Sequence, residues 1–145
     1  MVGNVLSERK YDKYFISEGV SFYKAKTMEK FQGSATPHFT LNDGFKDAFP
    51  DASLRGNGMV FVKPHVLVTE VHLHDFDEWL FFYGSNMQDI DEFDAEVEIN
   101  MGDEGEIYMI NNPTILYVPS GMKHCPLNFK VINKPVFFFH IRATT

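Results

Sequence analysis

From about residue 59 to its end, the chain alternates short apolar stretches with turn-forming residues. The stretches are rich in β-branched and aromatic residues, and turn formers such as Gly-Ser-Asn, Asn-Asn-Pro and Pro-Ser-Gly separate them. This pattern indicates β-strands joined by tight turns. The expected strands cover 59–64, 66–74, 78–84, 95–100, 106–111, 114–119 and 134–141. Regular short strands of this kind predict an all-β sandwich or barrel.

The first part of the chain has a different pattern. Residues 21–33 are a weak helical candidate, and residues 43–58 resemble a loop. We therefore expect residues 1–58 to form an N-terminal extension with strands, a loop and a short helix, packed on a barrel or on a partner subunit. Residues 59–145 would form the barrel core. The whole chain of 145 residues has the size of one ordinary domain.

Strand alternation places two histidines on the same face of the stretch 66–74. His72 and His74 are two positions apart, so in a strand their side chains project about 6 to 7 Å apart on one side. That spacing suits a shared metal ion. If both rings point into a barrel, Glu70 points inward with them unless a bulge intervenes. In the next stretch, an inward Glu78 would bring Leu80 and Phe82 inward, and Trp79, Phe81 and Tyr83 would face outward.

Composition and charge narrow the class of protein. Hydrophobic residues make up 44% of the chain and charged residues 23%, a normal globular mixture. The net charge is −7, and the segment between Lys63 and Lys123 contains thirteen of the twenty acids and no lysine or arginine. Such a surface repels phosphate groups, so neither a nucleic acid nor a membrane partner is expected.

Cysteine content and hydropathy bear on the compartment. A single cysteine, Cys125, excludes an internal disulfide and a zinc site built from several thiolates. The start of the chain has no signal-peptide pattern, and no run of ~18 apolar residues occurs. We expect a soluble, cytoplasmic protein.

Two histidine motifs stand in order along the chain. Residues 72–84 read H-x-H-x3-E-x5-G, and residues 119–128 read P-x-G-x-x-H-x-x-x-N. Together they resemble the paired signature motifs of the cupin superfamily. The second motif departs from the family pattern because Pro113, after two asparagines, stands where a glycine is usual, and asparagine also tolerates turn conformations. The first motif has five residues between glutamate and glycine where six are common.

The resemblance implies a fold and a metal site. The fold is a double-stranded β-helix, a jelly-roll barrel of antiparallel strands. Carried over position by position, the metal ligands would be His72, His74, Glu78 and His124. Three imidazoles and a carboxylate favour Fe, Mn, Ni, Co, Cu or Zn over Mg or Ca, and they leave two positions of an octahedral metal open for water or substrate. The resemblance also implies a homodimer.

Three further features of the sequence bear on possible metal or catalytic sites. His140 on the last expected strand either faces the cavity as an acid or base, or is a hydrogen-bonded histidine at a strand end. Cys125 follows a ligand, so alternation should turn it away from the metal. The acidic run 89–100 resembles a calcium loop but has Asp94 where such a loop needs glycine.

The leading hypothesis is a metal-dependent enzyme that acts on a small, partly hydrophobic organic molecule with oxygen atoms that chelate the metal. The chemistry would be either dioxygenation or a non-redox lyase or isomerase step. The candidate acid–base groups are Glu70, if it faces inward, and His140. The alternatives are a non-catalytic binding or sensor module, in which the metal only holds a ligand, and a site without metal.

Overall fold

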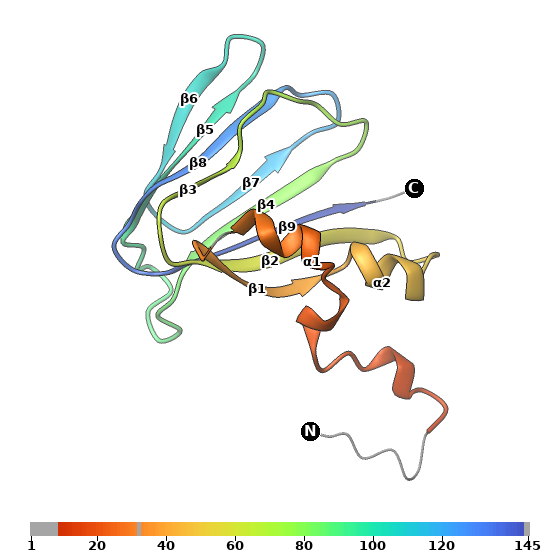
Figure 1. Ribbon diagram of the computed structural model, residues 1–145. Helices are drawn as coiled ribbons and strands as arrows, with labels where there is room; N and C mark the ends of the chain where they lie inside the picture. The colour runs from red at the N-terminus through yellow and green to blue at the C-terminus, as the bar shows by residue number, and fades with distance from the viewer. Residues whose placement is uncertain (1–8, 32, 144–145) are drawn as a thin grey trace.

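Nine strands in the part of the chain described by the computed structural model, residues 9–31 and 33–143, form two antiparallel sheets. The sheets face one another (Figure 1). One has the strand order β1-β2-β9-β4-β7 and the other β3-β8-β5-β6. The strands are β1 Ala35–Thr40, β2 Leu54–Phe61, β3 His65–Val68, β4 Glu78–Gly84, β5 Ala95–Met101, β6 Glu106–Ile110, β7 Thr114–Val118, β8 His124–Ile132 and β9 Val136–Ala143. The prediction of an all-β jelly-roll fold is confirmed.

Alternating burial along the strands shows why these segments pair as they do. In β4, Glu78, Leu80 and Phe82 are buried while Trp79 and Phe81 are half-buried on the opposite face. The inward and outward sides expected for this strand are therefore confirmed. A period of two in burial is what a strand between a core and an outer face requires.

The core lies where the inner faces of the two sheets meet. Four fully buried phenylalanines form its centre. The rings of Phe61 and Phe129 stack with centroids 3.9 Å apart, and the centroids of Phe82 and Phe138 are 5.0 Å apart. Burying a side chain of this size contributes about 1.5 to 3 kcal/mol, so this cluster is a major source of stability.

The segment before β1 packs against β1 and α2 and contributes Tyr23 and Phe31 to the core. The Tyr23 hydroxyl donates to the carbonyl of Phe39 at 2.8 Å, and the ring of Phe22 meets that of Phe45 edge to face at 5.7 Å. The short helices are η1 Asp12–Tyr14, η2 Gly19–Phe22, α1 Ala25–Met28, η3 Glu29–Phe31 and α2 Asp43–Ala48. Among the described residues, no helix is long and apolar enough to cross a bilayer.

In the first sixty residues, the secondary structure differs from the expected pattern. The expected loop 43–58 contains α2 and the first half of β2. The boundary expected between residues 58 and 59 falls inside β2, which pairs along its whole length with β9. The helical candidate 21–33 forms short helical turns instead of one helix, and residue 32 lies outside the described residues. The expected N-terminal extension 1–58 and barrel core 59–145 also include residues 1–8 and 144–145, which lie outside the described residues.

The expected strand 66–74 is shorter than its pattern suggested. β3 ends at Val68, after an irregularity between Val66 and Val68 in its pairing with β8. Beyond it, His72 forms an isolated antiparallel bridge with His124. The chain from 69 to 77 is therefore irregular, and strict alternation does not extend through it.

Candidate metal centre

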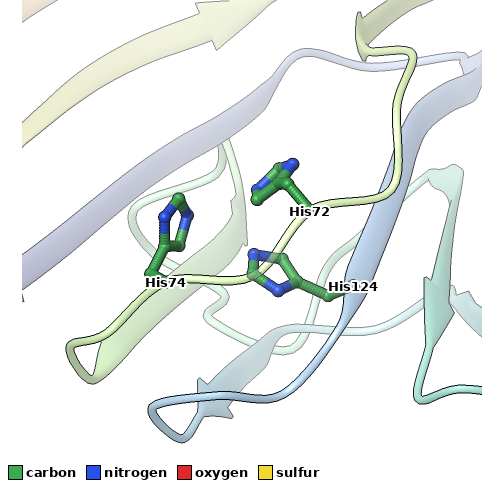
Figure 2. Close-up of side chains that lie close together, drawn as sticks. All are labelled: His72, His74 and His124. Carbon is green, nitrogen blue, oxygen red and sulfur yellow. The ribbon is translucent and has the colours of Figure 1, made fainter.

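Three imidazole rings gather between the two sheets (Figure 2). His72 and His74 lie on the segment between β3 and β4, and His124 is the first residue of β8. One ring nitrogen of each lies within 4.8 Å of the other two. The ring centroid of His124 lies 4.3 Å from that of His72 and 5.3 Å from that of His74. The structure thus brings together three of the four predicted ligands from two distant motifs.

Backbone hydrogen bonds hold the two motifs against one another. The amides of His72 and His124 each donate to the other's carbonyl, at 3.1 and 2.9 Å, and the amide of Gly121 donates to the carbonyl of His74 at 2.7 Å. Gly121 has a φ of +84°, which glycine adopts without steric cost. The Asp77 carboxylate accepts from the amide of Ser120 at 2.9 Å. These hydrogen bonds hold the proline-glycine turn at 119–121 directly beside the first motif.

Backbone carbonyls also orient two of the rings. Nδ1 of His124 lies 2.9 Å from the carbonyl of Met122, and Nδ1 of His72 lies 3.3 Å from the carbonyl of Glu70. A carbonyl can only accept, so each Nδ1 carries the proton and each neutral ring keeps the lone pair on Nε2. Nε2 of His124 is buried and has no hydrogen-bond partner. A proton fixed on one nitrogen, with the other free to coordinate, is typical of metal-bound histidine.

Glu78 lies next to this cluster at the start of β4. Its Oε1 is 3.5 Å from Nε2 of His124 and 3.8 Å from Nε2 of His74, and its Oε2 is 3.4 Å from Nδ1 of His140. Burial opposes ionisation, but the interactions with His124, His140 and His74 outweigh it and hold the pKa of Glu78 well below its usual range. Glu78 is an ionised carboxylate beside two of the three imidazoles, the place expected for the fourth ligand.

The pKa values of His124 and His74, the two histidines whose Nε2 atoms lie near Glu78, shift in opposite directions. Burial of the His124 ring lowers its pKa, but the Glu78 carboxylate and the carbonyl of Met122 raise it more, so the net shift is upward. For His74, burial dominates over the attraction of Glu78 and the pKa falls. The donor set fits a divalent transition metal, because neutral imidazoles and a carboxylate are its usual ligands.

A cavity of about 420 Å³ opens beside the imidazoles. Its wall is mainly apolar, with His140 and Arg142 from β9 as additional polar groups. The other lining residues are Leu67, Val68, Phe76, Leu80, Cys125, Leu127 and Phe138, besides the predicted ligands. Another cavity of about 460 Å³ is lined by β5, β6 and β7 and contains no histidine.

The structure places the two candidate acid–base residues differently. His140 faces the cavity, with Nδ1 beside Glu78 and without a hydrogen-bond partner. Glu70 is exposed and does not line the cavity. Glu70 does not take the inward orientation that unbroken alternation predicts, because the pairing of β3 shifts between Val66 and Val68 and the strand ends there, two residues before Glu70. Only its backbone carbonyl takes part in the site, through His72.

Cys125 also differs from expectation. Strand alternation predicted that it turns away from the site, but the residue has a φ of +78° and its pairing shifts between Ile99 and Met101 on β5. The alternation is broken at this position, and Cys125 lines the cavity. Burial, with a smaller effect of the Glu78 charge, raises the pKa of its thiol to about 12, so the thiol stays protonated.

Arg142 is a cavity residue that the sequence analysis missed. It lies directly across from Glu78 on β4 and from Arg55 on β2. A signal was present, because His140 and Arg142 are two positions apart on one strand and must share a face. The register between β4 and β9, which places that face beside Glu78, was not readable from the sequence.

Comparison with known proteins gives evidence about the fold. No family model matches the sequence, and no curated protein matches it. Among solved structures, Peruvianin-I, described as a cysteine peptidase from Thevetia peruviana latex, matches with a TM-score of 0.59 and 11% identity over 94% of this chain and 75% of its own. An oxalate oxidase structure matches with a TM-score of 0.55 and 12% identity over 97% of this chain.

This chain spans 64% of the oxalate oxidase chain, which is less than two thirds of its length. An RmlC-like cupin from Shewanella frigidimarina NCIMB 400 also matches, with a TM-score of 0.40 and 16% identity over 64% of this chain and 68% of its own. The chain has a cupin-type jelly-roll fold. At identities of 11 and 12%, these neighbours show the fold alone.

Proposed function

We propose that this cupin-fold protein is a metal-dependent enzyme acting on a small, partly hydrophobic organic molecule that chelates the metal through oxygen atoms. The observation that supports it best is the convergence of His72, His74 and His124, with an unpartnered Nε2 on His124. Three imidazoles from two motifs, two of them oriented by backbone carbonyls, are costly to assemble unless they bind something.

Each residue has a role in this proposal. His72, His74 and His124 would hold a divalent transition metal, with Glu78 as the fourth ligand. The bound metal would supply Lewis acidity, or a binding place for dioxygen if it is redox-active. His140 lines the same cavity beside Glu78 and would take a proton from the bound substrate. The apolar wall would exclude water and bind the hydrophobic part of the substrate.

The cavity also supports the class of substrate. Apart from the four predicted ligands, His140, Arg142 and the Cys125 thiol, its lining residues are aliphatic or aromatic. A free sugar needs many convergent polar groups, which this wall lacks. The volume of about 420 Å³ suits a molecule of modest size.

Metal analysis and turnover test the proposal. The full chain is purified and its metal content measured, together with His74→Ala and with His38→Ala, whose exposed imidazole lies outside the cavity. Wild type and His38→Ala should bind one metal per chain, and His74→Ala should bind far less. Equal metal content in all three, or none in wild type, would contradict the metal site.

The reaction class is tested on the metal-loaded protein. Oxygen uptake with a panel of enols, diketones and thiols, after loading with Fe, Mn, Ni, Co or Cu, tests dioxygenation. Anaerobic turnover of the zinc-loaded protein would support lyase or isomerase chemistry instead. A protein that binds metal and these molecules but turns over none of them would be a binding or sensor module.

The homodimer is part of the same proposal. The outer face of the five-stranded sheet carries paired aromatic rings, with Trp79 and Tyr117 at 5.3 Å and Phe81 and Phe139 at 4.3 Å. Tyr117 and Ile115 are exposed on the edge strand β7. A second subunit would cover such a face. Light scattering of the purified protein measures its mass and checks this expectation.

A further inference from the structure

Arg142 is the only lysine or arginine among the described residues that line the cavity beside the imidazoles. The rest of that wall is apolar apart from the predicted ligands, His140 and the protonated thiol of Cys125. A guanidinium in such a place is always charged, and it needs an acceptor or a counter-charge nearby. What Arg142 contacts therefore bears on what the cavity binds.

The contacts of Arg142 leave most of its donors available. A guanidinium has five N–H donors. Within the described part of the chain, the guanidinium of Arg142 makes one hydrogen bond, from Nη2 to Oδ1 of Asn42 at 3.3 Å. No carboxylate of the described residues lies within ion-pair distance of it, although it pairs in register with Glu78. Its Cζ lies 5.5 Å from the ring centroid of Phe76, which stacks on His74.

Arg55 provides an internal contrast on the neighbouring strand. It stands directly opposite Arg142 in the β2–β9 ladder and is almost fully buried. Its guanidinium donates to the carbonyls of Leu54 at 3.0 Å and Pro50 at 3.3 Å, and it does not line the cavity. Arg55 is therefore bound to the protein backbone, while Arg142 has donors free on the cavity side.

The neighbours of Arg142 hold it in place. Asn42, whose Oδ1 accepts from Arg142, is itself tied to β1 and β2, because its amide donates to Oγ1 of Thr40 and its Nδ2 to Oδ1 of Asn57. The Phe76 ring supports the guanidinium from another side through a cation–π contact. Because the guanidinium is already fixed in position, it loses little conformational entropy when it binds a carboxylate.

We propose that Arg142 binds a carboxylate of the substrate, which makes the substrate a partly apolar carboxylic acid whose other oxygen atoms reach the His72, His74 and His124 cluster. A carboxylate matches the guanidinium through two parallel hydrogen bonds. A phosphate dianion fits less well, because the cavity wall offers it a single permanent cation, and the Glu78 carboxylate on the same wall repels a second negative charge. This inference rests on the proposed function of the same site, and it adds the substrate class.

A simpler role for Arg142 is that of a counter-charge for Glu78. The two side chains stand on the same row of the sheet, and their charges act on each other. In that case replacing Arg142 would weaken metal binding or stability and leave the affinity for external carboxylates unchanged. The two roles therefore predict different results for the same variant.

The test measures binding of carboxylates to the full-length chain, metal-free and zinc-loaded, at pH 8, where exposed imidazoles are neutral. The probes are phenylacetate, benzoate and hexanoate, each paired with its neutral amide. The variants are Arg142→Gln, Arg142→Lys and Lys63→Gln. Lys63 is exposed and lies just after the last residue of β2, whereas Arg55 lies near the first. Replacing Lys63 therefore removes one positive charge far from the cavity. Titration calorimetry gives the affinities.

We expect wild type to bind at least one of the carboxylates more tightly than its amide. Arg142→Gln should lose about 10- to 100-fold in carboxylate affinity, as expected for a charge-assisted pair, and keep its amide affinity. Lys63→Gln should match wild type, and Arg142→Lys should fall between. Circular dichroism and zinc stoichiometry check that each variant is folded and loaded.

Several results would overturn the inference. They are equal carboxylate affinity in wild type and Arg142→Gln, an equal loss for acid and amide, and no binding of any of the three acids to wild type. Because the metal-free arm needs neither metal nor turnover, these failures are separate from failure of the proposed enzyme. A carboxylate site without metal binding would, conversely, leave this inference standing and remove the enzyme.

Discussion

The two ends of the barrel interior are built from the same strands, but they differ in how tightly they are packed and in how polar their side chains are. At one end, rows of large apolar side chains from β2, β4 and β9 fill the space between the sheets. At the other end, the same inner faces carry charged and polar groups around an open cavity. In register across the three strands, the rows are Phe61–Val136–Gly84, Met59–Phe138–Phe82, Asn57–His140–Leu80 and Arg55–Arg142–Glu78.

This gradient separates stability from chemistry within one fold. The packed end buries Phe61, Phe82, Phe129 and Phe138 without polar atoms that need partners. The open end leaves ring nitrogens of His124 and His140 without hydrogen-bond partners. Their nearest charged neighbour is the Glu78 carboxylate, at 3.5 and 3.4 Å, so the polar groups of the open end depend on one another, while the packed end contributes apolar burial. Substitutions at the two ends should therefore affect different measurements.

The largest effect on stability should come from the packed end. Phe129→Ala removes a fully buried ring that stacks on Phe61, and should lower the free energy of unfolding by about 3 to 5 kcal/mol. Urea unfolding followed by circular dichroism measures the change. Phe129→Leu leaves a smaller void and keeps the measurement possible if the alanine variant does not fold. Zinc stoichiometry of the folded variant should equal that of wild type, and a loss would contradict the separation of the two ends.

The largest effect on metal binding should come from the open end. His124→Ala removes a predicted ligand, and should lower metal affinity by on the order of 100-fold or more, since outer residues that only orient ligands already contribute 10- to 100-fold. Competition with a chromophoric chelator measures the affinity. His65→Ala, which does not line the cavity, is the control. An unchanged affinity in His124→Ala would show that the imidazoles do not act as one site.

An intermediate effect should appear in the pH dependence of the metal-free protein. The pKa of Glu78 is held low in the folded state, so its ionised form stabilises the fold fully above its unfolded pKa of about 4.3. That contribution is lost as pH falls through the folded pKa. Urea unfolding in the presence of a chelator should show wild type losing on the order of 1 to 3 kcal/mol more than Glu78→Gln between pH 5 and the acid limit.

A parallel variant serves as control for that comparison. Glu92→Gln removes a half-buried carboxylate that forms an ion pair with Lys134. Glu92 lies in the segment after β4, at the packed end and far from the imidazoles. Its unfolding should follow the pH dependence of wild type. If Glu78→Gln and wild type lose stability equally on acidification, Glu78 does not have a depressed pKa in the folded protein.

The smallest effect should come from Glu70, the residue whose inward position the structure corrects. Its side chain is exposed, and only its backbone carbonyl reaches His72. Glu70→Gln should change the free energy of unfolding by no more than about 0.5 kcal/mol, as for other surface substitutions. Metal affinity and turnover should remain within about twofold of wild type. A large loss of turnover would place Glu70 at the site after all.

Much of the fold and the metal cluster could be predicted from local patterns. Residue types and turn formers located β4, β5 and β9, and period-two alternation also gave the face that β4 buries, because a strand between a core and an outer surface imposes that period. β1 and β8 were absent from the expected strands. In β8 the ligand turn, a proline and a bulged register interrupt the pattern, although Leu127 and Phe129 alternate inward beyond them.

Where the local pattern breaks, the prediction failed. Glu70 and Cys125 were both assigned a face by continuing strand alternation, and both lie at positions where the pairing with a neighbouring strand is interrupted. A shift of one residue reverses the side to which a side chain points. Such irregularities arise from pairing between distant segments, which a single stretch of sequence does not contain.

By itself, the sequence determined which residue types could form a metal site and on which short segments they stand, because spacing within one strand or turn is a local property. Only the tertiary structure decided that Arg142 joins His140 and Glu78 at one cavity, that Cys125 enters it and that Glu70 leaves it. The reason is physical. Strand register is set by the packing of two whole sheets, and it places side chains together that are up to about a hundred residues apart, as with Asn42 and Arg142.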